Sequence, residues 1–316
     1  MTERSLRQHV DDFIAYKRSL GYIYDGQAGY LKNYVSFVER RPFTLSIPTK
    51  ESTDEYIGTI SSSNATLYGN ISVLREFSRY LRAHGLEAYV IPPKTISQPV
   101  AEEPYFFSLE EVEAFFCELD KIEPHKSFKG REIVFPALFR LLYCCGLRCK
   151  EARTLECSNV HTKERYIDII QSKGPKSRRI FISDELADYL ARYDMKIRIL
   201  FPSRKYYFPH GDKCYESSAI SANFRRFWNR AFPDFELKTR PRAYDFRHHF
   251  AWNNLNRWAA EGLDLNVMLP YLMRYMGHQS VQETLYYFHF VPEFFPTYRK
   301  MAEPLENLIP EVPYDE

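Results

Sequence analysis

The sequence lacks any apolar run that approaches the roughly eighteen residues needed for a membrane-spanning helix. It contains 6 Cys, but their spacing is not that of a disulfide scaffold, and no apolar segment typical of a signal peptide follows its first residues. These absences argue against a membrane protein and against a disulfide-stabilised secreted domain. We therefore expect a cytoplasmic protein with reduced cysteines and no membrane partner.

A strong net charge is missing as well, because 43 Lys and Arg oppose 41 Asp and Glu, which gives a formal net charge of +2. A protein that binds nucleic acid can carry so small a charge if its basic residues cluster, so the value neither supports nor excludes such a partner. The hydrophobic and charged fractions, 45% and 27%, are ordinary for a soluble protein. A chain of 316 residues is long enough for about two domains.

The first part of the chain has the apolar periodicity of a helical domain. Apolar residues recur there at three- and four-residue spacing in four segments, and Gly85 follows the last of them as a stop signal. Proline-rich sequence without such periodicity comes next, as expected of an extended linker. We predict a helical domain over 1–90, a linker over 91–106 and a second domain over 107–316.

The second domain begins with a capping box, in which Ser108 and Glu111 can satisfy each other's backbone N–H groups at a helix start. The next helix, roughly 129–145, is apolar on nearly every side and should be buried at the centre of the domain. It ends at a glycine, and the chain then presents Arg148 on a short helix. Glu151 lies on the same face and can hold the guanidinium by a forked hydrogen bond.

A hairpin follows, with strand signals at 165–171 and 178–183 and a basic Gly-Pro turn that contains Lys173 and Lys176. In an isolated hairpin, these would be ordinary exposed lysines. Helical patterns at about 184–200 and 217–231 come after the hairpin.

The sequence offers little to a metal ion. Cys144, Cys149, Cys157 and His161 lie in one region, but no Cys-x-x-Cys pair is among them. The cysteines of the apolar helical run are better explained as core residues. We expect neither a metal nor another cofactor.

The most informative stretch begins at Tyr244 and ends at His289. It brings an arginine and a histidine together beside tyrosine hydroxyls, which is what an enzyme needs to bind a phosphodiester and attack it. The stretch, with the earlier arginine and lysine, resembles the catalytic domain of the tyrosine recombinase (phage-integrase) family. The residues that carry the resemblance, in chain order, are Arg148, Lys173, Arg247, His248, Gly277, His278 and Tyr287.

The resemblance implies a mainly α fold with a small β-sheet, in which a helical core-binding (SAM-like) domain precedes an α/β catalytic domain. It implies a site-specific recombinase or integrase that cuts duplex DNA without a metal, forms a 3′-phosphotyrosyl link and exchanges strands through a Holliday junction. Family members act as tetramers, so we expect a homo-tetramer on DNA with specific recombination sites. Residues 291–309 have helical spacing and are the candidate for a docking helix.

The resemblance also assigns catalytic roles. Arg148 and Arg247 would bind the non-bridging phosphate oxygens, because guanidinium groups are planar and permanently charged donors. His278, which we expect at a helix start after Gly277, would add a hydrogen bond to the phosphoryl group, and Lys173 would protonate the departing 5′ oxygen. Tyr287 would be the nucleophile, because it has the spacing from His278 that the family shows.

Other polar residues are given supporting roles. We expect Glu151 and His248 to orient or pack around the catalytic groups. Clustered basic residues are typical of a DNA-facing surface, although a solvated helix face explains any single one of them equally well. The candidates for phosphate contacts are Lys176, Arg225, Arg226 and Arg242, with Lys17, Arg18, Arg75, Arg79 and Arg82 in the helical domain.

Tyr244 departs from the family pattern, which usually has His at this position. A neutral phenol can donate one hydrogen bond to a phosphate oxygen, but it cannot add positive charge or readily shuttle a proton as imidazole can. We expect a functional substitute. Two other interpretations stay open, namely a hairpin telomere resolvase or type IB topoisomerase-like enzyme, and a DNA-binding accessory protein whose catalysis has decayed.

Overall fold

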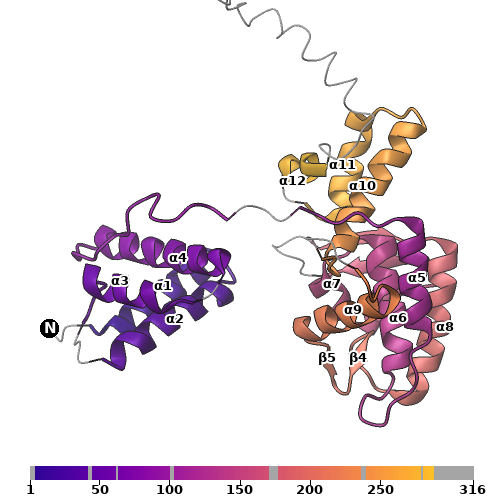
Figure 1. Ribbon diagram of the computed structural model, residues 1–316, viewed down its shortest axis with the longest axis horizontal. Coiled ribbons are helices and arrows are strands. Elements are labelled where there is room, and N and C mark those ends of the chain that lie inside the picture. The colour runs from indigo at the N-terminus through magenta and orange to yellow at the C-terminus, as the bar shows by residue number, and fades with distance from the viewer. Residues whose placement is uncertain are drawn as a thin grey trace, which may run out of the picture. The chain divides into compact units, whose positions relative to one another are not determined.

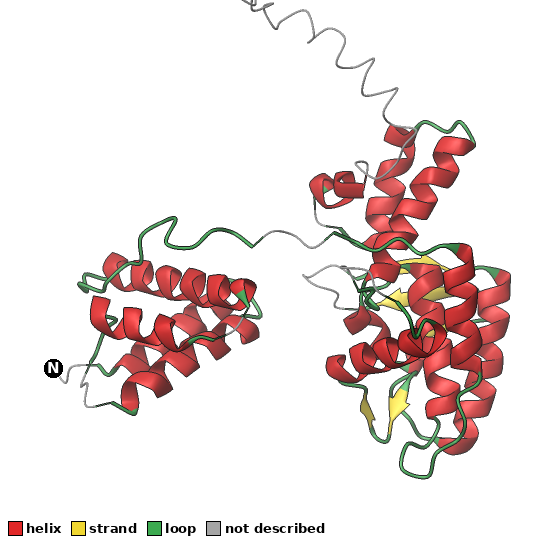
Figure 2. Cartoon of the chain, viewed as in Figure 1, coloured by secondary structure: helices red, strands yellow, loops and turns green. Residues whose placement is uncertain are grey.

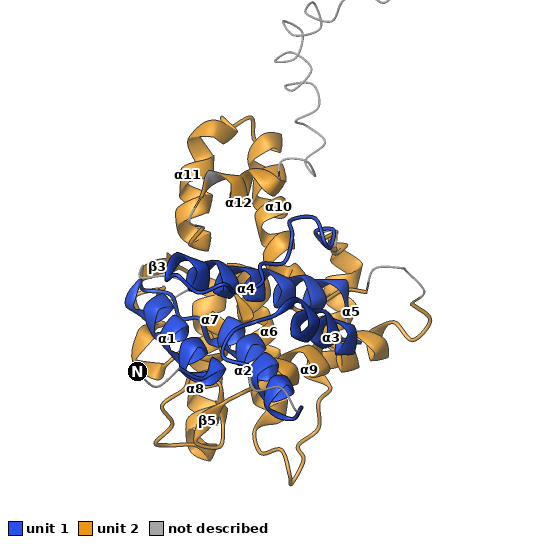
Figure 3. Cartoon of the chain, turned by 90° about the vertical axis from the view of Figure 1, so that its left-hand side faces the viewer, with its two compact units in different colours: residues 1–102 blue, residues 103–316 orange. Residues whose placement is uncertain are grey.

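A computed structural model describes residues 4–41, 45–61, 63–99, 103–170, 177–235, 240–278 and 280–287. The chain divides into two compact units, residues 1–102 and residues 103–316 (Figure 3). Each unit has its own cluster of buried apolar side chains.

Unit 1 is a bundle of helices (Figure 1). Its helices are α1 (Leu6–Ser19), α2 (Asp25–Glu39), α3 (Lys50–Thr59) and α4 (Asn64–Ala83). Large side chains spaced along one face of each helix fill the core, among them the fully buried Phe13, Tyr34 and Phe77. Ser5, Thr49 and Ser63 accept a backbone N–H at the starts of α1, α3 and α4, so side-chain caps fix where these helices begin. The helical pattern read from this region is confirmed.

Unit 2 is mainly helical with two small antiparallel sheets (Figure 2). Its helices are α5 (Leu109–Asp120), α6 (Arg131–Cys145), α7 (Cys149–Arg153), the 3-10 turn η1 (Cys157–Asn159), α8 (Asp184–Leu200), α9 (Ser217–Ala231), α10 (Asp245–Ala260), α11 (Leu265–Met276) and α12 (Val281–Leu285). Its strands are β1 (Val160–His161), β2 (Tyr166–Ile169), β3 (Arg178–Phe181), β4 (Pro209–His210) and β5 (Lys213–Cys214). The predicted fold class, mainly α with a small sheet, is confirmed.

Helix α6 lies at the centre of unit 2, as its apolar sequence predicts. It contacts α5, α8 and α10, and its Val134, Leu138 and Leu141 are fully buried. The predicted capping box at the start of α5 is also present, because Ser108 Oγ accepts from the Glu111 N–H and Glu111 Oε2 accepts from the Ser108 N–H. Local sequence signals therefore predict both α5 and α6 correctly.

The larger sheet has the order β1-β2-β3, and Ile167 of β2 faces Ile180 of β3. Side chains alternate between its two faces, so Ile180 is buried while its neighbours Arg179 and Phe181 are exposed. Both strands are shorter than predicted. The turn between them, with Lys173 and Lys176, lies outside the described residues.

Gly146 closes α6 in a conformation that other residues rarely adopt, with a φ of +57°. A Cβ at this position would lie 2.5 Å from Cδ1 of Phe250 on α10. The carbonyl of Gly146 accepts a hydrogen bond of 2.7 Å from Nη1 of Arg247. This glycine therefore lets α10 approach the end of α6 and places the arginine there.

We expect Gly146→Ala to lower the free energy of unfolding of unit 2 by about 2 to 5 kcal/mol, because left-handed strain and overpacking against Phe250 add. Gly211→Ala is the matched control, since Gly211 has a φ of +61° but open space around its Cα. It should cost about 1 kcal/mol, from strain alone. Urea unfolding followed by tryptophan fluorescence measures both, because all 3 Trp lie in unit 2. Equal losses in the two variants would contradict the steric explanation.

Candidate active site

A cavity of about 520 Å³ collects residues from three distant regions of the unit 2 sequence, at 148, 244–248 and 278–287. Arg148 comes from the start of α7, Tyr244 and Arg247 from the start of α10, and His278 from the end of α11. Tyr287 follows α12. The residues that line the cavity are Arg148, Tyr244, Arg247, His248, His278, Ser280, Gln282, Glu283, Tyr286 and Tyr287. The fold thus brings together five of the six residues assigned catalytic roles.

Arg247 is buried, with 1% of its surface exposed, and its charge is met by helix ends. Its Nη1 donates to the carbonyl of Gly146 and its Nη2 to the carbonyl of Met276, both at 2.7 Å. These carbonyls lie at the C-termini of α6 and α11, where backbone oxygens lack helical partners and the helix dipole is negative. Burial lowers the pKa of Arg247 to about 10, and neighbouring Arg148 adds to this effect, so the group stays cationic at neutral pH.

Arg148 is held by Glu151, as its sequence spacing predicts. Nη1 of Arg148 lies 3.0 Å from Oε1 of Glu151, and the Arg148 backbone N–H donates to Oε2. Nη2 donates to the carbonyl of Gly277 at 3.0 Å. The guanidinium is therefore fixed in place before any ligand binds.

Arg178 on β3 is a site residue that the sequence interpretation missed. Its Nη1 and Nη2 bind the two oxygens of Glu151, each at 2.9 Å, and its Nε donates to the carbonyl of Tyr275 at 2.7 Å. Only 8% of its side chain is exposed. A signal was available, because strand alternation places Arg178 on the same face as the buried Ile180 and Arg179 on the other face.

The C-terminal end of α11 is thus bound by three arginines. The successive carbonyls of Tyr275, Met276 and Gly277 accept from Arg178, Arg247 and Arg148 respectively. Gly277 has a φ of +68°, and a Cβ there would lie 2.9 Å from Nη1 of Arg178. The glycine therefore gives the arginines access to the helix end.

His278 comes directly after this glycine, at the end of α11 and not at the helix start that we predicted. Helix α12 begins only at Val281. A left-handed glycine commonly ends a helix, and Gly277 is the left-handed C-cap of α11. Nδ1 of His278 and Oγ1 of the buried Thr284 form a hydrogen bond of 2.6 Å, which leaves Nε2 as the nitrogen that can reach a ligand. Burial, then Arg247 and Arg148, lowers the pKa of His278 to about 3, so the imidazole is neutral.

Tyr287 lies against the small core between α10 and α11 and is 3% exposed. Its hydroxyl oxygen is 3.0 Å from Nδ1 of His248. Burial raises the pKa of the phenol above its ordinary value, while Arg247 and Arg148 oppose this effect. The hydroxyl is therefore protonated in the free protein, and attack requires a group that takes its proton.

Tyr244 is 43% exposed at the mouth of the same cavity, and its ring meets that of His248 edge-on at a centroid distance of 5.0 Å. Arg242 is anchored just before it, because Asp245 accepts from both the backbone and the guanidinium of Arg242. Arg225 and Arg226 are exposed on α9 but are not among the described residues that line the cavity.

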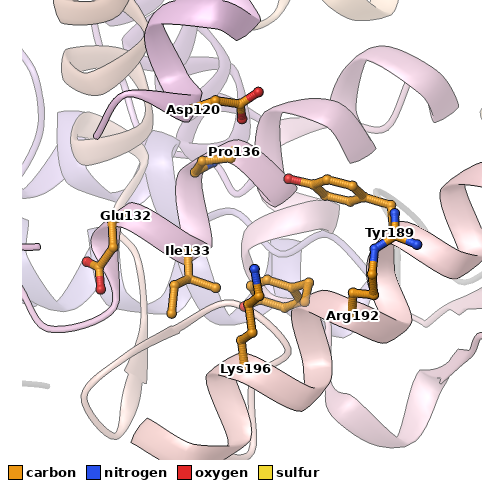
Figure 4. A pocket seen from close by; sticks show the side chains of 8 residues that line it. Asp120, Glu132, Ile133, Pro136, Tyr189, Arg192 and Lys196 are labelled. Atoms are coloured by element: carbon orange, nitrogen blue, oxygen red, sulfur yellow. The ribbon is translucent and has the colours of Figure 1, made fainter. Parts of the chain in front are cut away.

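A second cavity, of about 350 Å³, lies between α6 and α8 beside the end of α5 (Figure 4). Asp120, Glu132, Tyr189 and Lys196 line it, and no residue of the tyrosine recombinase motif does. Asp120 already forms an ion pair with Arg140. The first cavity is therefore the candidate active site.

The described residues contain no group of three or more His, Cys, Asp or Glu side chains arranged to hold a metal ion. Within the same part of the chain, no helix has both the length and the apolar sequence that crossing a bilayer requires.

A sequence model of the phage integrase family matches residues 106–293, more than half of the chain. The chain belongs to the phage integrase family. Among similar family proteins, the integrase/recombinase y4rE of Sinorhizobium fredii is 26% identical over 290 residues, which cover 90% of this chain and 91% of that protein. The tyrosine recombinase XerD of Lacticaseibacillus casei is 28% identical over 234 residues, which cover 69% and 70%.

Solved structures show the same integrase fold. The site-specific recombinase XerH, bound to a palindromic difH substrate, superposes with a TM-score of 0.62 at 20% identity, over 95% of this chain and 84% of that one. The resemblance to tyrosine recombinases is therefore confirmed. Lys173 and the segment 291–309 fall outside the described residues, so their assigned roles stay predictions.

In this integrase, we expect Arg178→Met to lower the free energy of unfolding by about 3 kcal/mol, the lower end of the range for breaking a buried ion pair, because Arg148 still compensates Glu151. Arg179→Met is the matched control. Arg179 follows Arg178 on β3 but lies on the exposed face, where it forms an ion pair with Asp168 of β2. Exposed pairs contribute little to stability, so this variant should unfold like the wild type. Urea unfolding by tryptophan fluorescence measures both. A stable Arg178→Met protein would show that Glu151 does not need its second cation.

Proposed function

We propose that the chain is a site-specific DNA recombinase or integrase that cuts and rejoins duplex DNA through a 3′-phosphotyrosyl intermediate and a Holliday junction. One observation carries this proposal. The buried hydroxyl of Tyr287 shares a cavity with two fixed guanidiniums and a neutral imidazole. This arrangement suits the attack of a tyrosine on a phosphodiester.

The charges match what the reaction needs. Attack builds negative charge on the non-bridging oxygens, and the cations of Arg148 and Arg247 can neutralise it without moving, because both are already held by carbonyls. His278 can donate from Nε2 to the same phosphoryl group. Lys173 would protonate the departing 5′ oxygen. The covalent link conserves the energy of the phosphodiester, so this chemistry requires no nucleotide. The two guanidiniums supply positive charge at the phosphate, and we propose that the reaction is independent of metal ions.

The proposed partners are duplex DNA with specific recombination sites and further copies of the chain in a homo-tetramer. The solved structure of XerH bound to its difH substrate supports a DNA partner. Arg225 and Arg226 are exposed on α9, as phosphate contacts require. In this assembly, residues 291–309 would form the docking helix, and unit 1 would act as the core-binding domain.

We expect Tyr287→Phe to abolish covalent protein–DNA adducts and to leave DNA binding unchanged, because it removes one oxygen and little volume. The control is Tyr286→Phe, since Tyr286 lines the same cavity but lies one residue short of the predicted spacing. Capture of denaturation-resistant adducts on nicked duplexes measures both, and the sequences of the captured DNA identify the site.

An adduct that persists in Tyr287→Phe and disappears in Tyr286→Phe would overturn the assignment of the nucleophile. DNA binding without any adduct from the wild-type protein would favour the accessory-protein alternative. Hairpin-ended or merely relaxed products, in place of exchanged strands, would favour the telomere resolvase or topoisomerase alternative.

We expect Tyr244→Phe to slow cleavage by about ten- to a thousandfold with little change in DNA affinity, the scale of losing one hydrogen-bond donor in the transition state. Tyr244→His should keep activity. Tyr271→Phe serves as the control, because Tyr271 is exposed on α11 and does not line the cavity. Single-turnover cleavage of the captured duplex gives the rates. Full activity of Tyr244→Phe would show that its hydroxyl contributes nothing.

A further inference from the structure

His248 forms a hydrogen bond with the hydroxyl of Tyr287, the proposed nucleophile. Its Nδ1 lies 3.0 Å from the Tyr287 oxygen, and the two ring centroids are 5.6 Å apart. The residue sits in the first turn of α10, directly after the anchored Arg247. The contact joins α10 to the residues that follow α12, and both segments line the cavity.

The other groups that line the cavity are less well placed to take the tyrosine proton. Glu283 is a carboxylate, but it is an exposed residue of α12, and the hydrogen bond of the Tyr287 hydroxyl is with His248. Nδ1 of His278 is bonded to Thr284, and the ring of His278 stacks on that of Tyr287 at 6.3 Å. Arg148 and Arg247 are already protonated and can only donate. Tyr244 carries a phenol that is itself a weak acid, so it is a poor proton acceptor at working pH.

We propose that His248 is the general base of the cleavage step, an inference that rests on the proposed function. In the tautomer with hydrogen on Nε2, Nδ1 accepts from the Tyr287 hydroxyl. As the tyrosine oxygen bonds to phosphorus, its proton passes to Nδ1, and the bond from phosphorus to the 5′ oxygen breaks. The 5′ oxygen leaves with a proton from a separate acid, for which Lys173 is the candidate.

Religation runs through the same groups in reverse. The 5′ hydroxyl attacks the phosphotyrosine and gives its proton to the group that acted as the acid, for which Lys173 is the candidate. The bond from phosphorus to the Tyr287 oxygen breaks, and the imidazolium of His248 returns its proton to that oxygen. The step therefore needs no oxidant, reductant or further reactant. This is the microscopic reversal that a rejoining enzyme requires.

The charge state of the free site agrees with this role. Burial lowers the pKa of His248 to about 4, with Arg242 and Arg247 adding to the effect and Asp245 opposing it. The imidazole is therefore neutral at pH 7 and has a lone pair to offer. A bound phosphodiester places negative charge beside the two guanidiniums, which offsets their field and makes the imidazole more basic.

The test measures single-turnover cleavage of a nicked duplex that carries the sequence recovered by adduct capture. It compares the rate of the 316-residue protein with the rates of its variants. His248→Asn keeps an acceptor oxygen near the position of Nδ1 but cannot take a proton. We expect it to form adducts at least about a hundredfold more slowly, the scale of general-base catalysis, with DNA binding retained. His249→Asn is the matched control, because His249 is the next residue of α10 but accepts from the Phe107 N–H in the core. It should cleave like the wild type, at a lower melting temperature. If His248→Asn does not fold, His248→Gln takes its place.

A second measurement separates a base from a residue that only positions the tyrosine. Tyr287 is replaced by a fluorinated tyrosine, whose phenol is more acidic and needs less help to lose its proton. The deficit of His248→Asn should then shrink at least about tenfold, because the base contributes less when the nucleophile ionises more readily. Equal deficits with the two nucleophiles would overturn the proposal, and so would a His248→Asn protein that cleaves within about threefold of the wild type. Neither result would touch the proposed function, which fails only if the wild type forms no adduct or if Tyr287→Phe still forms one.

Discussion

The C-terminal end of α11 is the constraint on which the site depends. The last carbonyls of a helix have no partner within it, so they must be satisfied from outside. Here three of them accept from Arg178, Arg247 and Arg148, which belong to three different segments. The hydrogen bonds that complete one helix therefore also bring the cations of the site together. His278 and Tyr287 follow the same helix end in sequence, so they are placed by the same anchor.

Three guanidiniums held close together repel one another, and neighbouring acceptor groups reduce this repulsion. Glu151 binds two of the guanidiniums, and helix-end carbonyls bind the third. Burial, together with the remaining positive field, lowers the pKa of both His248 and His278 far below neutrality. The free site thus holds fixed cations and neutral imidazoles beside a protonated phenol. Such a site favours an anion, because a bound phosphate would neutralise the positive charge that the protein's own carboxylates and carbonyls do not.

Residue patterns predict the local part of this arrangement, and the family resemblance predicts five of the residues that the fold brings together, but neither predicts Arg178. Helical periodicity and the Ser108 capping box predict the elements correctly, and three-residue spacing predicts the Arg148–Glu151 contact. Arg178 was missed because its partners come from α7 and α11, and nothing in the local pattern of β3 names them. His278 was assigned to a helix start because Gly277 was read without its role as a helix end. Roles that depend on convergence of distant segments require the fold.

The position of His248 on α10 explains how tyrosine can replace the family's usual histidine at position 244. Residues 244 and 248 are four apart, so they lie one turn apart on the same side of the helix, and both face the nucleophile's cavity. An imidazole one turn further along can therefore serve the tyrosine oxygen while the phenol at 244 is free to bind phosphate. A weakly basic imidazole also suits a reaction that must run in both directions. Burial keeps the pKa of His248 low, so its conjugate acid readily returns the proton when the tyrosine leaves.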